Sequence, residues 1–121
     1  MNLYEQIGEE KIDLLIDVLY DDIIANDDRI NLLFHDGFEN VKKEQKVFFR
    51  IFLGAPTNIM KMPDLKEKHM NFPISKEVAH YWIEDFEKAI DKIELDSSIK
   101  YFLNKKIKML GMHMINTVKT N

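Results

Sequence analysis

The sequence predicts an all-α protein. Apolar residues recur three and four positions apart along almost the whole chain, which is the spacing that places side chains on one face of an α-helix. Only 4 Gly and 3 Pro occur among 121 residues, too few turn formers for a β-sandwich or β-barrel. With 45% apolar and 31% charged residues, the composition is that of a globular protein, and we expect residues 1–121 to form a single domain.

The first long helix is expected over about residues 9–25. Its apolar stripe consists of Ile12, Leu15, Ile16, Leu19 and Ile23. The polar run at 26–28 ends this helix, and a short helical segment is expected over 30–34. The sequence His35-Asp36-Gly37 then interrupts the pattern.

A second stripe predicts the next long helix. It is formed, with spacings of four, three and four, by Val41, Gln45, Phe48 and Phe52. Gly54-Ala55-Pro56 ends this helix, because Gly is favoured just past a helix C-terminus and Pro cannot continue a helix. Residues 57–63 show no periodicity and are expected to form a loop, followed by a short helical turn over 64–70.

Two further helices are expected in the second half of the chain. Ser75 is a suitable N-cap, and Glu77 follows in the first turn, where a carboxylate is favourable. The stripe of this helix is Val78, Trp82, Phe86, Ala89 and Ile93. The run Asp96-Ser97-Ser98 begins the last helix, whose stripe is Leu103, Ile107, Leu110, Met114 and Val118.

Composition excludes several classes of function. The absence of cysteine excludes disulfides, thiolate nucleophiles, Cys-bound zinc and covalently attached c-type haem. A net charge of −4 gives no electrostatic case for binding nucleic acid. No apolar run approaches the roughly 20 residues of a membrane helix, and no signal peptide is visible, so we expect a cytoplasmic protein without membrane partners. No catalytic triad or phosphate-binding loop can be argued from spacing, and we predict no catalytic residues.

Three polar or amphipathic side chains lie on apolar stripes and are expected to face the interior: Tyr20, Gln45 and Trp82. A buried amide without a partner costs roughly 1–3 kcal/mol, and a buried hydroxyl or indole N–H also needs a partner. Each has an ordinary structural explanation. Gln45 can reach water at the edge of its stripe, Tyr20 can bond a backbone carbonyl, and Trp82 can simply fill the core. Periodicity leaves both interpretations open.

The four histidines show no spacing typical of a multi-histidine metal site: His35, His69, His80 and His113. His69 is flanked by Lys66 and Lys68 and precedes Phe72-Pro73. It is either an exposed loop residue or a single axial ligand of the kind that holds b-type haem, with the two lysines pairing with propionates. His80 and His113 are interpreted as surface residues.

Several motifs are in register with a known family. Tyr4-Glu5-Gln6-Ile7-Gly8 is similar to an opening motif, and Gly54-Ala55-Pro56 to a closing Gly-Gly-Pro. Lys68-His69, Phe72, Ile74 and Trp82, thirteen residues after His69, resemble a proximal histidine motif and a distal tryptophan. Together these residues resemble truncated haemoglobins, most closely group II, the short bacterial globins with a two-over-two helical sandwich.

The resemblance implies a globin-like fold around non-covalently bound haem b. It implies that His69 binds the iron and that Phe34 wedges against the haem. Further contacts to the cofactor are implied for Phe48, Lys66, Lys68, Phe72 and Trp82. The side where a ligand binds is implied to contain Tyr20, Val41, Gln45 and Trp82.

The implied function is tight, reversible binding of O₂ at a five-coordinate iron, with CO and NO as further ligands. Tyr20, Gln45 and Trp82 would act as three donors in a dry pocket, where hydrogen bonds are stronger than in water. One alternative is an enzyme that oxidises NO or uses peroxide, with an external reductase. Another is a haem-free helical interaction module, which predicts a colourless protein with an exposed apolar patch.

Overall fold

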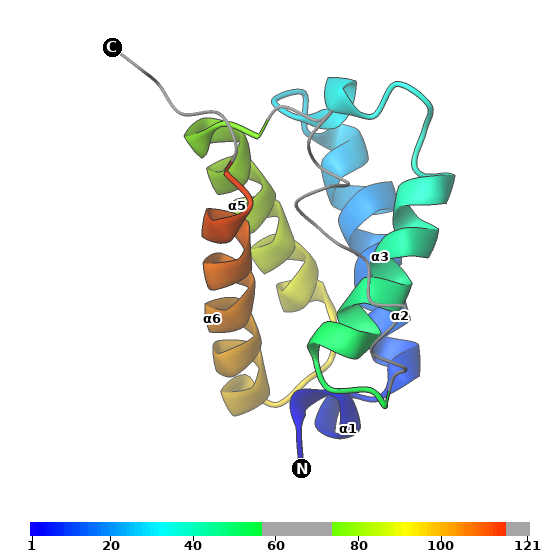
Figure 1. Ribbon diagram of the computed structural model, residues 1–121, viewed down its shortest axis with the longest axis vertical. Helices are drawn as coiled ribbons and strands as arrows, with labels where there is room; N and C mark the ends of the chain where they lie inside the picture. The colour runs from blue at the N-terminus through cyan, green and yellow to red at the C-terminus, as the bar shows by residue number, and fades with distance from the viewer. Residues whose placement is uncertain (57–73, 116–121) are drawn as a thin grey trace.

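The all-helical prediction is confirmed across the described part of the chain. The computed structural model describes residues 1–56 and 74–115, and residues 57–73 and 116–121 lie outside this description (Figure 1). The described ranges contain no strand. The helical elements in chain order are α1 (Leu3–Ile7), α2 (Glu9–Asp17), η1 (Val18–Ile23), η2 (Ile24–Asn26), η3 (Asn31–Leu33), α3 (Glu39–Phe52), α5 (Lys76–Lys92) and α6 (Ser97–His113).

The helices form two layers, which confirms the predicted two-over-two sandwich. In the first layer, α2 and its continuation η1 lie beside α3 (Figure 1). In the second layer, α5 and α6 run antiparallel to each other. Because η1 also packs against α5, the two layers are joined through this element.

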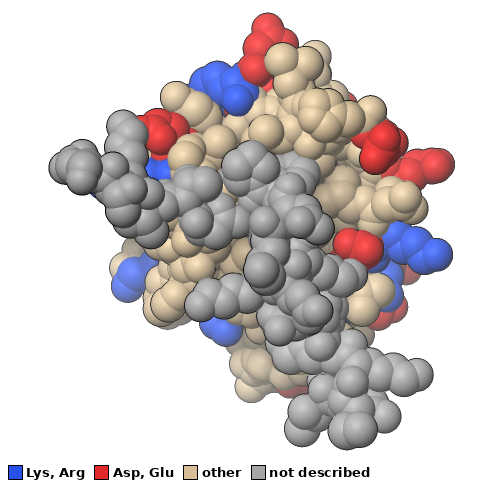
Figure 2. Space-filling view, turned by 45° about the horizontal axis from the view of Figure 1, so that its top comes forward, with Lys and Arg blue, Asp and Glu red and all other residues tan. Residues whose placement is uncertain are grey.

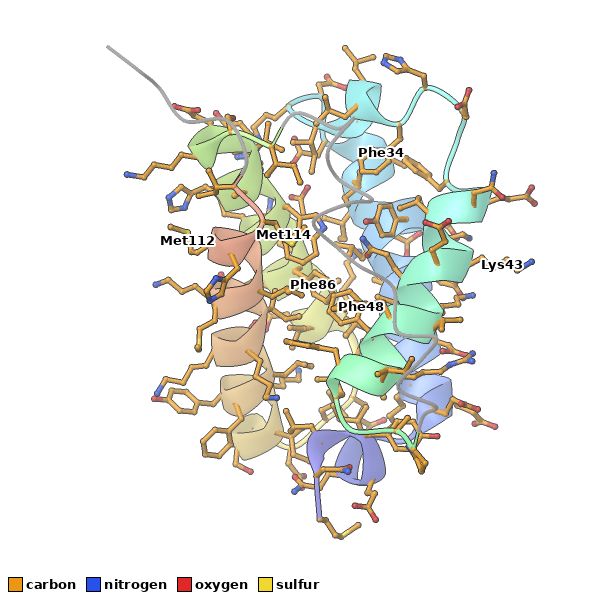
Figure 3. All side chains as sticks on the ribbon, in the orientation of Figure 1. Phe34, Lys43, Phe48, Phe86, Met112 and Met114 are labelled. Carbon is orange, nitrogen blue, oxygen red and sulfur yellow. The ribbon has the colours of Figure 1, made fainter. Side chains whose placement is uncertain are left out.

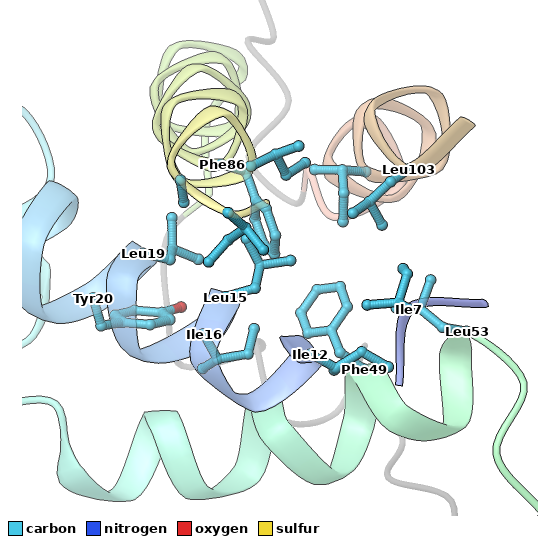
Figure 4. Close-up of a cluster of buried hydrophobic side chains, with 14 of the residues drawn as sticks. Ile7, Ile12, Leu15, Ile16, Leu19, Tyr20, Phe49, Leu53, Phe86 and Leu103 are labelled. Atoms are coloured by element: carbon cyan, nitrogen blue, oxygen red, sulfur yellow. The ribbon is translucent and has the colours of Figure 1, made fainter. Parts of the chain in front are cut away.

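The core fills the space between the two layers. Figure 4 shows a group of its side chains, drawn from every long helix: Ile12, Leu15, Ile16, Leu19, Tyr20, Phe49, Phe86 and Leu103. All of them except Phe49 were predicted to face inward. The helical period therefore identifies the core of this fold well, because each of these helices buries one stripe against the opposite layer.

The prediction of one regular α-helix over residues 9–25 is wrong in its second half. α2 ends at Asp17 and continues as the π-helix η1, followed by the 3₁₀ turn η2. A π turn closes over five residues instead of four, which shifts the register by one position. The consequence is that Ile24 is fully buried, whereas Ile23, the predicted core residue, is only half-buried.

α3 buries a second row of side chains beside the predicted one. Of the predicted row, Phe48 is buried and the other members are half-buried: Val41, Gln45 and Phe52. Phe49 and Leu53 are almost completely buried. Phe49 reaches Phe86 of α5, with ring centroids 5.2 Å apart. A helix that contacts neighbours on two sides needs a wider apolar face than a single stripe provides.

The N-terminal helix α1, which has no counterpart among the predicted helices, is fastened to the end of α3. The Asn2 side chain caps α1 by accepting a hydrogen bond from the Glu5 N–H (2.8 Å), and its Nδ2 donates to the Gly54 carbonyl (2.9 Å). The Tyr4 N–H donates to the Leu53 carbonyl (2.8 Å). Gly54 has a φ of +122°, and a Cβ there would overlap the Asn2 side chain, so this junction favours glycine.

The later boundaries largely follow the predicted signals. Ser75 caps α5 by accepting a hydrogen bond from the Val78 N–H (3.1 Å), and α6 begins at Ser97 as expected. The segment at 30–34 is the short 3₁₀ turn η3. The predicted loop at 57–63, the turn at 64–70 and Val118 lie outside the described residues.

Candidate functional site

Three aromatic rings meet beside η1. The ring centroid of Tyr20 lies 5.4 Å from that of Phe34 and 5.7 Å from that of Phe38, and the two phenylalanine rings are 5.5 Å apart. Tyr20 comes from η1, Phe34 follows η3, and Phe38 precedes α3. Edge-on packing of this kind fixes the orientation of the Tyr20 ring from two sides.

The buried Tyr20 hydroxyl is the point at which the predicted polar side chains converge. Tyr20 is only 1% exposed, and the side chains of Trp82 and Gln45 approach its hydroxyl closely enough to lower its pKa. An indole N–H can only donate, so Trp82 can act on the Tyr20 oxygen only as a donor. Burial raises the pKa of Tyr20 above its usual value, and the two neighbouring side chains offset only part of this effect. The hydroxyl therefore keeps its proton at neutral pH.

Gln45 contributes an acceptor to the same site. Its Oε1 is buried and has no hydrogen-bond partner within the described ranges. The lowering effect of Gln45 on the Tyr20 pKa is that of a donor, which in this side chain is Nε2. The polar centre of the site thus combines a buried hydroxyl with one unpartnered amide oxygen.

Aromatic side chains of α3 pack against one another and against Trp82. Phe48 stacks on Phe52, with centroids 5.4 Å apart, and Phe49 stacks on Trp82 at 6.4 Å. Figure 3 shows Phe48 turned into the space between the layers, with Lys43 of the same helix pointing away. Val41, one turn before Gln45, is half-buried. Residues predicted to line a ligand pocket are therefore brought to one side of the fold.

The residues predicted on the other side of the cofactor cannot be placed. Lys66, Lys68, His69 and Phe72 all lie outside the described residues. The histidines that are described, His35, His80 and His113, are exposed, which for the last two agrees with the prediction. Within residues 1–56 and 74–115, no group of three or more His, Asp or Glu side chains is arranged to hold a metal ion.

Charge is mixed on the surface. Figure 2 shows basic and acidic side chains alternating around one face, without a continuous basic patch on the part that is visible. None of the helices in the described part of the chain is long and apolar enough to cross a membrane.

Three residues of this region lie outside the predicted apolar stripes: Phe38, Phe49 and Asp85. Phe38 precedes α3 and has no stripe of its own, so periodicity gave no signal. Phe49 belongs to the second inward row of α3. Asp85 is different, because it lies three residues after Trp82 on the inward face of α5 and is completely buried. A charged residue on an apolar stripe is the same kind of signal that singled out Gln45.

A two-layer helical fold around an aromatic-walled site with a buried tyrosine hydroxyl is the architecture of a globin. A family model described as bacterial-like globin matches residues 2–116 of the chain. The chain belongs to this family. Membership implies a haem cofactor and the binding of small gaseous ligands such as O₂.

The similar proteins are truncated haemoglobins of group II. The Group 2 truncated hemoglobin YjbI of Bacillus subtilis (strain 168) is 31% identical over 116 residues, covering 93% of this chain and 87% of that protein. The solved truncated oxygen-avid haemoglobin from Bacillus subtilis is 30% identical, with a TM-score of 0.85 over 96% of this chain and 100% of that one. The group II truncated hemoglobin from Bacillus anthracis is 28% identical, with a TM-score of 0.86 over 97% and 92%.

Proposed function

We propose that the protein binds O₂ tightly and reversibly at haem b, with Tyr20 as the residue that holds the ligand. The observation that supports this most directly is the buried Tyr20 hydroxyl, with the side chains of Trp82 and Gln45 beside it. We propose that both side chains donate to its oxygen, which leaves the hydroxyl one proton to donate to a ligand. CO and NO, which are diatomic as well, are proposed as further ligands of the same site.

The residues present fit a haem. A flat apolar group requires aromatic and aliphatic walls, and half-buried side chains of this kind gather on the ligand side: Phe34, Phe38, Val41, Phe52 and Trp82. The buried, unpartnered Oε1 of Gln45 indicates a site that is completed by something other than the described protein atoms. The chain contains no cysteine, so the cofactor would be held without thioether bonds.

On the opposite side, we propose that His69 supplies the single nitrogen that binds the iron. Haem iron held by one histidine keeps a coordination position open for a diatomic ligand. Lys66 and Lys68 are proposed to pair with the propionates, and Phe34, Phe48 and Phe72 to pack against the macrocycle. The exposed positions of His35, His80 and His113 support His69, because these three histidines face solvent instead of the site.

We further propose a relay with one terminal donor, in place of the three independent donors implied by resemblance. In this relay Trp82 and Gln45 donate to Tyr20, which orients the Tyr20 proton and makes the hydroxyl a stronger donor. A buried, oriented donor stabilises a ligand that carries partial negative charge, and each such bond contributes roughly 1–2 kcal/mol. Tight binding of this kind agrees with the oxygen-avid relative from Bacillus subtilis.

Replacing Gln45 with Leu tests this relay. Loss of one of the two bonds that orient Tyr20 should raise the O₂ dissociation rate by roughly fivefold, since about 1 kcal/mol is lost. CO carries less charge and should be released at nearly the original rate. Both rates are measured by stopped-flow ligand replacement on the haem-loaded protein. Lys43→Leu, on the outward face of the same helix, is the matched control. Equal changes in the O₂ and CO rates would contradict the proposed hydrogen bond.

The alternative of a haem-free interaction module has one observation in its favour. The outer face of α6 exposes large apolar side chains: Tyr101, Phe102, Met109 and Met112. This patch lies on the side of α6 away from its buried residues Leu103 and Ile107. A surface patch leaves the buried Tyr20, Gln45 and Trp82 network unexplained, so binding of haem and O₂ remains the better account.

A further inference from the structure

Asp85 is the only fully buried charged side chain in the described part of the chain. It lies on α5, three residues after Trp82, and faces the segment that follows η2. From that segment, Arg29 Nη2 lies 3.5 Å from Asp85 Oδ1 and 2.9 Å from Asp27 Oδ2, so the two carboxyl groups meet at one guanidinium nitrogen. On α5 itself, Glu84 pairs with Arg29 (3.2 Å), and Lys88 acts on Asp85 through its charge.

The buried carboxyl group of Asp85 obtains a hydrogen-bond partner within this cluster when it shares a proton with Asp27. Arg29 is engaged by Asp27, with Nε to Oδ1 and Nη2 to Oδ2 both at 2.9 Å. As a carboxylate, Asp85 has no hydrogen-bond partner within the described ranges for either oxygen. A proton on Asp85 removes this deficit, because Asp85 can then donate to Asp27.

The electrostatics agree with this assignment. Burial, followed by the hydrogen bond to Asp27, raises the pKa of Asp85 to about 7. The Arg29 guanidinium holds the pKa of Asp27 well below its usual range. Two interacting carboxyl groups whose pKa values are separated in this way carry one proton between them near neutral pH.

The shared proton joins the two elements that hold the candidate ligand site. Asp27 directly follows η2, which continues from η1 and hence from Tyr20. Asp85 is one turn beyond Trp82 on α5. Arg29 strengthens the same junction, since its guanidinium lies 4.2 Å from the centroid of the Tyr81 ring on α5.

We propose that Asp85 is a positioning residue for the ligand site, which shares a proton with Asp27 and thereby holds the Trp82 indole against the Tyr20 hydroxyl. The link to ligand release rests on the proposed function, whereas the link between the Asp85 proton and Trp82 does not. Loss of the proton places two carboxylates side by side between η2 and α5. Their repulsion weakens the Trp82 to Tyr20 hydrogen bond, so O₂ release should become faster as the pH rises.

The same group makes stability depend on pH in a defined direction. Because the folded-state pKa of Asp85 is raised above its ordinary value of 3.8, the folded protein binds more protons than the unfolded chain between these values. The contribution of Asp85 to the free energy of unfolding is therefore fully present at low pH and decreases as the pH rises toward about 7. The Asp85→Asn variant, which donates without ionising, should lack this decline.

The first test observes Trp82 directly. It is the only tryptophan in the chain, so a protein labelled with ¹⁵N at tryptophan gives one indole resonance. In the CO-saturated haem-loaded protein, this resonance should shift with a midpoint near pH 7 in a titration from about pH 5 to 9. The shift should be absent in Asp85→Asn and should move to lower pH in Asp27→Asn, because the negative charge beside Asp85 is removed. His80→Gln controls for the exposed histidine two residues before Trp82 and should retain the wild-type midpoint.

The second test measures O₂ dissociation over the same pH range. We expect the rate to rise by about fivefold with pH in the wild type, the lower end of typical coupling between sites, and to be flat in Asp85→Asn. An indole titration that persists in Asp85→Asn, or is absent from the wild type, would overturn the proposal. If the protein binds no haem, the indole titration is measured on the unloaded protein, so failure of the proposed function is distinguished from failure of the Asp85 assignment.

Discussion

Replacing His69 with Ala is expected to abolish the five-coordinate ferrous haem spectrum. The proposed coordination bond from this imidazole would be what fixes the iron, since the sequence contains no cysteine for thioether attachment of the cofactor. The aromatic walls contributed by Phe34, Phe48 and Phe52 should still retain some haem, but without a defined axial ligand. The measurement is an absorption spectrum of the dithionite-reduced variant after hemin is added.

His80→Ala is the matched control for this variant, because His80 is exposed on α5. It should leave the spectrum unchanged, and addition of free imidazole should restore a ligand-bound spectrum to His69→Ala alone. An unaltered ferrous spectrum in His69→Ala would refute the assignment of the iron ligand, and the other histidines would then be tested in the same way.

Replacing Tyr20 with Phe is expected to raise the O₂ dissociation rate by about tenfold or more. The change removes the terminal donor of the relay, and a loss of about 1.4 kcal/mol corresponds to a factor of ten. A phenyl ring preserves the packing against Phe34 and Phe38, so the fold and the haem site should survive. The rate is measured by stopped-flow mixing of the O₂-saturated protein with CO.

Tyr101→Phe removes the same hydroxyl group from an exposed ring on α6 and serves as the control. Its O₂ dissociation rate should equal that of the wild type. If Tyr20→Phe also left the rate unchanged, the donor argument would fail, even if haem binding itself were intact.

Helical periodicity predicted much of this fold, because each long helix buries a stripe between two layers. It placed Leu15, Leu19 and Phe86 in the core and brought Tyr20 to the inward face. It could not predict the π turn of η1, which depends on how that segment packs against α5. One extra residue in that turn exchanges Ile23 for Ile24 in the core.

The candidate site was predicted to a different extent on its two sides. Polar residues on apolar stripes identified Tyr20, Gln45 and Trp82, and the structure brings the three side chains together around the Tyr20 hydroxyl. Which of them donates to which depends on three-dimensional geometry that no spacing can show. The pairing of Asp27 with Asp85 joins residues far apart in sequence, and periodicity cannot find such a partner.

The most direct measurement is a hemin titration of the purified protein, followed by reduction and exposure to O₂ and CO. We expect saturable binding of one hemin per chain, a sharp Soret band, and spectra that change reversibly with each gas. A broad spectrum without saturation would contradict haem binding. The network around Tyr20 would then be a structural feature of a helical protein with another role.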